Sequence, residues 1–177
     1  LALNSLAATV SQSLDLEEIL AKATQKVLAV TNSEAGCVFL SDARKKELKL
    51  VSYTGSSNLF RCLQSRSVTA NCACHQVLNF GHALLVNDVS QCPMLAKEAT
   101  TRESTPYFVS VPLKSKDKVL GVMNVTCSAE RCFTERDFEL MHSIGYHVGL
   151  AVENSMLYQE TRQKEELRGQ LLSTIIN

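Results

Sequence analysis

The chain has 177 residues, of which 45% are hydrophobic, and its 18 basic residues balance its 18 acidic ones. That length and hydrophobic content suit a single domain with a buried core. The zero formal net charge, without a basic stripe or arm, argues against nucleic-acid binding, and no apolar run approaches the roughly 18 residues of a membrane span. Because the chain starts at Leu1 without a methionine, we expect a fragment of a longer protein.

Cysteine usage bears on the cellular compartment. Seven cysteines are many for this length, and the number is odd. Six of them could pair in a secreted protein. However, the chain is rich in helical patterns and core residues, so it does not require a disulfide framework. We therefore expect a reducing, cytoplasmic location.

The first third of the chain shows two helical patterns followed by two strand patterns. Apolar residues at helical spacing predict that residues 1–12 end an incoming helix. An Asp-x-x-Glu capping pattern opens a second helix over residues 15–30. The segments 34–42 and 47–55 are predicted strands, joined by a short polar turn.

The middle of the chain is less regular. Short helices are predicted at 58–65 and at Cys74–Phe80, and Gly81 stands at the usual C-terminal stop position of the second one. Residues 83–89 are a predicted strand. The stretch 90–105 is polar and irregular.

The last third combines a hairpin with a long helix. Residues 106–126, PYFVSVPLKSKDKVLGVMNVT, alternate as two apolar strands around a charged turn. A Thr134-x-x-Asp137 cap then opens a helix over 135–160. The element order predicts an α+β fold with an antiparallel sheet. Four apolar residues of the long helix are expected to be buried against that sheet: Phe138, Met141, Ile144 and Val148.

The hairpin and the following FTERDFELMHSIGYHVGLAVENSMLY resemble the C-terminal half of a GAF domain, a small sensory module. SLDLEEILAKATQKVLAVTNSEAGCVFLSD and GHALLVNDV extend the resemblance over residues 13–158. It implies a central antiparallel sheet of five or six strands, with the N- and C-terminal helices on one face and a ligand cavity on the other. It also implies a sensor rather than a catalyst.

The C-terminal tail suggests what the domain is attached to. Leu150, Leu157 and Leu171 follow a seven-residue spacing that Lys164 interrupts, which is a partial coiled-coil pattern. The tail is similar to the segment that precedes the dimerisation and phosphoacceptor helix of bacterial sensor histidine kinases of the nitrate-sensor-like subfamily. The alternative is a solvated helix tail.

This second resemblance implies a domain organisation and partners. Residues 1–12 would be an incoming signalling helix, residues 13–158 the GAF domain, and residues 159–177 an outgoing helix toward a kinase output domain. We expect a parallel homodimer through the terminal helices and a response regulator downstream. The fragment has no ATP-binding or phosphoacceptor motif, so it is not expected to be an enzyme, although the full-length protein is expected to be a histidine kinase. The runner-up function is a structural dimerisation module without a signal.

The densest group of reactive side chains is ANCACHQVLNFGHALLVNDVSQCP. Thiolates bind soft metals, zinc and iron–sulfur clusters. By resemblance, the helix before the 83–89 strand and the loop after it face one cavity. Three thiols are therefore expected to converge, with Cys62 or His75 as a fourth ligand of a metal or cluster. These three are Cys72, Cys74 and Cys92.

Four interpretations of this group stay open: buried packing of small apolar residues, a metal or cluster, a thiol redox switch, and haem. Covalent haem attachment is disfavoured because Cys72-x-Cys74-His75 is one residue shorter than the Cys-x-x-Cys-His pattern. Non-covalent haem would use His75 or His82. A bilin is disfavoured because the Cys-His pair lies more than thirty residues too early for the bilin-binding position of GAF domains.

A cyclic nucleotide is also disfavoured. Asn124, Phe133 and Asp137 match three positions of the Asn-Lys-Phe-Asp-Glu signature of nucleotide-binding GAF domains, but Val125 and Phe138 replace the Lys and the Glu. The three matches are also common in GAF domains that bind no nucleotide.

Two further expectations concern the surroundings of the thiols. Cys74 at a helix N-terminus is expected to have a lowered pKa. Phe108 and Val109 are expected to form part of the cavity wall. Cys37 and Cys127, within predicted strands, are expected to pack in the core.

Overall fold

The computed structural model describes residues 16–42, 44, 47–55, 72–86, 107–127 and 133–177. Its elements in chain order are α2 (Leu16–Thr31), β1 (Ala35–Asp42), β2 (Glu47–Gly55), α3 (Ala73–Phe80), β3 (Leu84–Val86), β4 (Tyr107–Ser115), β5 (Lys118–Cys127) and α5 (Glu135–Ile176). The predictions for residues 1–12, 58–65 and 90–105 lie outside the described residues.

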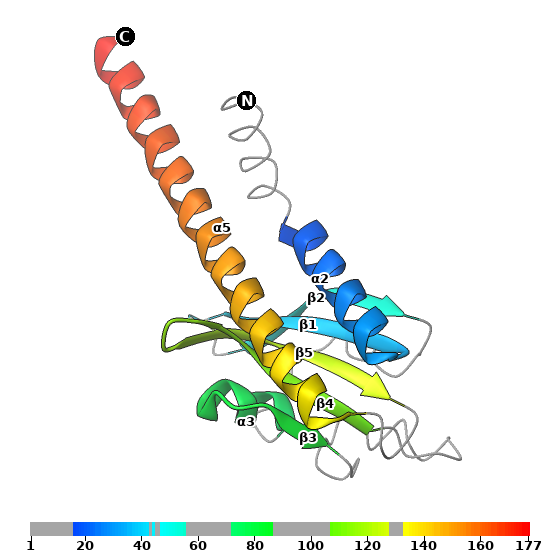
Figure 1. The fold of residues 1–177 in the computed structure, drawn as a ribbon. Coiled ribbons are helices and arrows are strands. Elements are labelled where there is room, and N and C mark those ends of the chain that lie inside the picture. The colour runs from blue at the N-terminus through cyan, green and yellow to red at the C-terminus, as the bar shows by residue number, and fades with distance from the viewer. Residues whose placement is uncertain (1–15, 43, 45–46, 56–71, 87–106, 128–132) are drawn as a thin grey trace, which may run out of the picture.

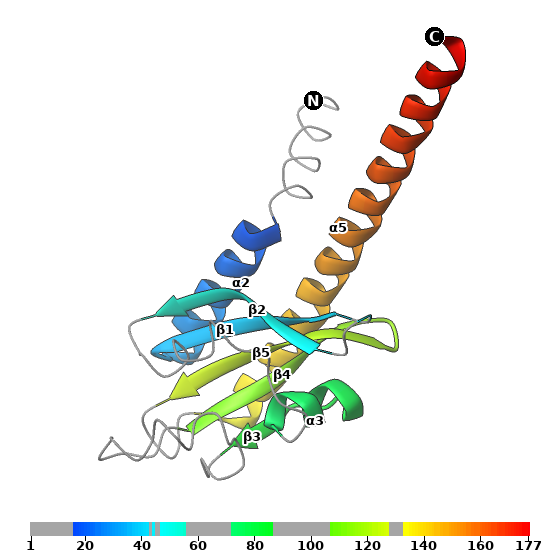
Figure 2. The ribbon, with the colours of Figure 1, turned by 180° about the vertical axis from the view of Figure 1, so that it is seen from behind.

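The five strands form one antiparallel sheet in the order β2-β1-β5-β4-β3. α2 and α5 lie side by side on one face of the sheet, and α3 covers part of the other (Figure 1; Figure 2). The predicted α+β fold, with a central antiparallel sheet and the terminal helices on one face, is confirmed. Because side chains alternate along each strand, the sheet separates two cores, one beneath each helical layer.

The core under α2 and α5 is apolar, and we call this side the helix face. Met141 and Val148 of α5 are buried in it, as predicted. Phe138 and Ile144 are only partly buried. With 100° per residue, these two positions flank the line through Met141, Val148 and Val152 that points at the sheet, so they lie at the margins of the contact.

Two glycines bring α5 onto the backbone of β4. A Cβ atom at Gly145 would lie 2.5 Å from the carbonyl oxygen of Pro112, and one at Gly149 would lie 2.2 Å from that of Lys114. One turn further on, the buried Ser115 hydroxyl donates a hydrogen bond to the Glu153 carboxylate. The first half of α5 is therefore tied to the C-terminal end of β4.

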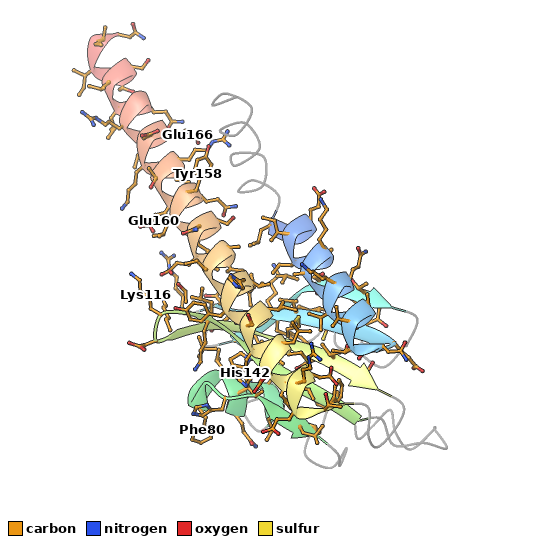
Figure 3. The ribbon with its side chains drawn as sticks, in the orientation of Figure 1. Phe80, Lys116, His142, Tyr158, Glu160 and Glu166 are labelled. Carbon is orange, nitrogen blue, oxygen red and sulfur yellow. The ribbon has the colours of Figure 1, made fainter. Side chains whose placement is uncertain are left out.

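α5 begins at a capping box, in which the Thr134 hydroxyl and the Asp137 carboxylate each bond to the other residue's backbone N–H. The helix then runs unbroken to Ile176 and projects beyond the sheet (Figure 1). Figure 3 shows Tyr158, Glu160 and Glu166 on this projecting part. The predicted boundary at residue 158 is marked by no break in the helix, so the division into domain and outgoing helix stays a prediction. None of the described helices is long and apolar enough to cross a membrane.

Candidate thiol site beneath α3

α3 is a two-turn helix with defined ends. Cys72 is its N-cap, with an extended backbone at φ −94° and ψ 161°. Gly81 follows its last residue with φ 71°, and the Gly81 N–H bonds to the Val77 carbonyl, which confirms the predicted stop. The N-cap position means that Cys72, and not Cys74, stands at the boundary between loop and helix.

One side of α3 carries the residues that pack on the sheet. Cys72, Cys74 and Val77 are buried, whereas Phe80 is 75% exposed and points away at the end of the helix (Figure 3). We call the side of the sheet beneath α3 the α3 face. Its core consists of Cys37, Phe39, Leu48, Cys72, Ala73, Cys74, Val77, Val86, Phe108 and Val122.

The two cysteines of α3 contact each other and two further polar groups. The Cys72 and Cys74 side chains form a hydrogen bond. The Cys72 sulfur lies 3.4 Å from Nδ1 of His75. On the sheet side, the side-chain amide of Asn124 donates to the Cys74 sulfur over 3.1 Å. The site thus joins the first turn of α3 to the middle of β5.

These contacts separate the acidities of the two thiols. The hydrogen bond from Cys74 lowers the pKa of Cys72 to about 6, against the opposing effect of burial, and His75 lowers it further. The hydrogen bond to Cys72 and complete burial raise the pKa of Cys74 well above its usual range. In the thiolate form of the pair, Cys72 therefore carries the charge and Cys74 keeps the proton.

The expected low pKa of Cys74 is therefore wrong. The residue does lie in the first turn of a helix, but its sulfur points into the sheet, where burial disfavours a charge. The charge-stabilising surroundings belong to its neighbour two residues earlier.

Beneath the thiols, a row of polar side chains crosses the sheet. Tyr53, Cys37, Asn124 and Ser110 are successive cross-strand partners on β2, β1, β5 and β4, so their side chains share one face. Asn124 and Ser110 are almost completely buried. Within the described part of the chain, Asn124 Oδ1 and Ser110 Oγ have no hydrogen-bond partner.

Cys37 is buried as predicted, but the sequence gave no sign that it lies near the α3 thiols. Its negative form would contribute to the raised pKa of Cys74. The connection depends on the pairing of Cys37 with Asn124 across β1 and β5. The three cysteines whose side chains the structure describes, Cys37, Cys72 and Cys74, form no disulfide.

The structure brings together four of the predicted site residues, namely Cys72, Cys74, His75 and Phe108. Val109 lies in the other core, beneath α2 and α5, so its expected place in the cavity wall is wrong. Successive residues of a strand point to opposite faces, and Phe108 already points to α3. His82, the other candidate haem ligand, is exposed beyond α3.

Cys62 and Cys92 lie outside the described residues, so the four-ligand metal site stays a prediction. Among the side chains that are described, no three His, Cys, Asp or Glu are placed to hold one metal ion. A hollow of about 230 Å³ lies along β2 beside Leu50, Val51, Ser52 and Tyr53. Tyr53 also packs against the α3-face core, so the hollow adjoins one end of the polar row.

A family model described as GAF domain matches residues 13–153. The chain belongs to the GAF domain family. Sensor histidine kinase YhcY of Bacillus subtilis is 22% identical to this GAF domain over 169 residues, which are 93% of the chain and 44% of the kinase. The formate hydrogenlyase transcriptional activator of Salmonella typhimurium is 25% identical over 159 residues, or 86% of the chain and 23% of the activator.

Solved structures agree with the fold. The GAF domain/HD domain protein from Geobacter sulfurreducens superimposes with a TM-score of 0.71 at 14% identity, covering 83% of this chain and 97% of that one. The chain spans less than half the length of the two curated relatives, which are a kinase and a transcriptional activator. It is thus a regulatory GAF domain of a kind that occurs in larger signalling proteins.

Proposed function

We propose that this GAF domain is the redox-sensing input domain of a cytoplasmic two-component sensor histidine kinase, and that the Cys72–Cys74 thiol pair is the sensing element. The similarity to a sensor kinase over 93% of the chain supports the first part. The projecting α5, at the end of the domain that would lead to the kinase, supports it as well. A response regulator would receive the phosphoryl group downstream.

The contact between the two thiols is the observation that carries the redox function. Two sulfur atoms already in hydrogen-bonding contact can form a disulfide with little backbone movement. A thiolate beside a protonated thiol is the combination that thiol–disulfide exchange uses. The same pair packed as apolar residues would not need the hydrogen bonds from His75 and Asn124.

A continuous set of contacts leads from the thiols to α5. Asn124 holds Cys74 from β5, and β5 pairs with β4. The end of β4 contacts α5 through Gly149 and through the Ser115–Glu153 hydrogen bond. A shift of α3 on oxidation would therefore reach the helix that continues toward the output domain.

The test is to equilibrate the purified domain in glutathione redox buffers and to map disulfides by mass spectrometry. Hydrogen exchange of α5 is followed in the same samples. We expect a Cys72–Cys74 bond and altered exchange at the β4–α5 contact, both absent in Cys74→Ser. Cys37→Ser is the matched control, because it removes a buried thiol of the same core. Absence of the bond, or a bond that leaves α5 unchanged, would contradict the proposal.

An iron–sulfur cluster is the second form that redox sensing could take at this site. It would need Cys62 and Cys92 in addition to the pair. Iron and sulfide analysis after anaerobic reconstitution separates the two forms. A cluster that is lost in Cys92→Ser would favour the cluster, whereas a metal-free protein that still forms the Cys72–Cys74 bond favours the thiol switch.

The runner-up function, a dimerisation module, is favoured by exposed leucines on α5. Leu150, Leu157 and Leu171 are 43%, 54% and 58% exposed and repeat every seven residues. We propose that a second copy of the chain covers them in a parallel homodimer, which a kinase requires in any case. A dimer whose stability ignores the redox state of Cys72 and Cys74 would favour the purely structural function.

A further inference from the structure

The two thiols of α3 differ in their surroundings. Cys72 is the N-cap of the helix, with its sulfur 3.4 Å from His75 Nδ1. Cys74 is enclosed between α3 and β5, and its sulfur accepts a hydrogen bond from the Asn124 side chain. One sulfur thus lies at the end of the helix, and the other is held in place by the sheet.

From this arrangement we propose that Cys72 attacks a small hydroperoxide, of the size of hydrogen peroxide, and that Cys74 resolves the product to a disulfide. This assignment rests on the proposed redox function and names its oxidant and the role of each cysteine. It reverses the expectation that Cys74 is the reactive thiolate.

The reaction has two steps. In the first, the Cys72 thiolate sulfur attacks one peroxide oxygen, the O–O bond breaks, and hydroxide leaves. Cys72 becomes a sulfenic acid and the peroxide is reduced by two electrons. In the second, the Cys74 sulfur bonds to the Cys72 sulfur and gives up its proton. The S–O bond breaks, and the departing hydroxide takes that proton to form water.

Geometry favours Cys72 for the first step. A helix N-terminus presents unpaired backbone N–H groups and the positive end of the helix dipole, which stabilise a thiolate. α3 has this end at Cys72, and no acidic side chain lies in its first turn. The lowered pKa of Cys72 agrees with this placement.

Cys74 suits the second step because Asn124 fixes its position. The Asn124 amide donates to the sulfur, so the sulfur is held beside Cys72 while it keeps its proton. A resolving thiol needs this proximity more than it needs acidity. The peptide link of only one intervening residue keeps the two sulfurs together throughout the reaction.

Burial limits the size of the oxidant. Cys72 has no exposed surface, and it packs in the core beneath α3. A molecule the size of water or hydrogen peroxide enters such a site through small fluctuations, whereas an aromatic hydroperoxide requires α3 to lift from the sheet. We therefore expect hydrogen peroxide to react faster than cumene hydroperoxide.

The test uses Cys74→Ser and Cys72→Ser, with Cys74→Ala as a second variant should serine disturb the core. Each folded variant, checked by circular dichroism, is treated with hydrogen peroxide in the presence of dimedone, which traps sulfenic acids. We expect an adduct on Cys72 in Cys74→Ser and Cys74→Ala, and at least about tenfold slower trapping on Cys74 in Cys72→Ser. Wild type should yield the disulfide instead. Trapping on Cys74 at an equal or higher rate would overturn the assignment.

Two comparisons separate this inference from the proposed function. Oxidised glutathione that closes the Cys72–Cys74 bond, with hydrogen peroxide leaving it open, would overturn the inference and leave redox sensing intact. A bond that forms with neither oxidant would defeat both. Cumene hydroperoxide reacting as fast as hydrogen peroxide would overturn the limit on oxidant size. Cys37→Ser should react like wild type, and a loss of reaction in it would assign the chemistry to a different thiol.

Discussion

The two faces of the sheet are built on different principles. On the helix face, α2 and α5 cover a core of aliphatic side chains, and glycines let α5 touch the β4 backbone. On the α3 face, cysteines lie over a row that includes Asn124 and Ser110. Buried polar atoms without partners lower stability, so a protein keeps them where they serve another purpose. The helix face thus stabilises the fold, and the α3 face carries chemistry.

The largest effect should come from closing the α5–β4 contact. A Cβ atom at Gly149 would meet three backbone atoms of Lys114 at 2.2 to 2.5 Å, which no side-chain rotation can relieve. We expect Gly149→Ala to lower the free energy of unfolding by about 3 kcal/mol or more, at or above the usual range for overpacking. Urea denaturation at equilibrium measures this loss.

Gly169→Ala is the matched control on the same helix. No atom lies within 4 Å of the position that its Cβ would take. Alanine should therefore raise the stability of the helix by up to about 1 kcal/mol, through helix propensity alone. If Gly149→Ala were as harmless as this control, α5 would not be docked on β4 as described.

The next effect compares two consecutive residues of β5 that face opposite ways. Val125 lies in the helix-face core, and Asn124 lies beneath Cys74. Val125→Ala should cost about 2 kcal/mol of stability because it leaves a cavity. Asn124→Ala should cost about 1 kcal/mol or less, because it removes one hydrogen bond together with a buried oxygen that had no described partner. Equal losses would mean that both faces stabilise the fold alike.

Local patterns in the sequence predicted much of the helix face and little of the chemistry. Alternation located β2 at 47–55 to the residue, and Gly81 marked the end of α3. Short-range signals suffice there, because each residue's environment follows from the period of its own element. Val109 was misassigned because its alternation with Phe108 was not applied to the cavity wall.

The thiol site depends on contacts between distant segments. Asn124 and Cys74 are fifty residues apart, and Cys37 reaches them only through the register of β1 against β5. No local pattern encodes that register, so the sequence could pair Cys72 with Cys74 but could not show which of them is held by the sheet. The acidity of the pair was misassigned for the same reason.

A smaller effect is expected from pH, and only on the α3 face. The folded pKa of Cys72, about 6, lies below the ~8.5 of an unfolded cysteine. Between these values the unfolded chain binds a proton that the folded chain lacks, so this group stabilises the fold increasingly as pH rises. The contribution is lost as pH falls through 6.

Urea denaturation of wild type and Cys72→Ala between pH 6 and 8 tests this dependence. The stability difference between them should shift in favour of wild type as pH rises, by less than about 1.4 kcal/mol per pH unit. Above this window the raised pKa of Cys74 acts in the opposite direction, which is why the range stops at pH 8. Parallel curves for the two proteins would show that Cys72 is an ordinary thiol. Val125→Ala, on the other face, should run parallel to wild type.

The smallest effect on the stability of the domain, yet a decisive one for its assembly, concerns the second half of α5. Here the helix leaves the helix face, and Leu157 and Leu171 are more than half exposed. Replacing Leu157 with Lys should barely change the unfolding of the monomer, because no core contact is lost. If a second copy packs on this seam, the same change should weaken the dimer, whereas Lys164→Leu should strengthen it by completing the seven-residue repeat. Lys164 now pairs only with the exposed Glu160 on its own helix, so little is lost by replacing it. Sedimentation equilibrium at micromolar concentration measures both changes. A chain that stays monomeric in all three forms would leave α5 as a solvated tail and would remove the dimer from the proposed function.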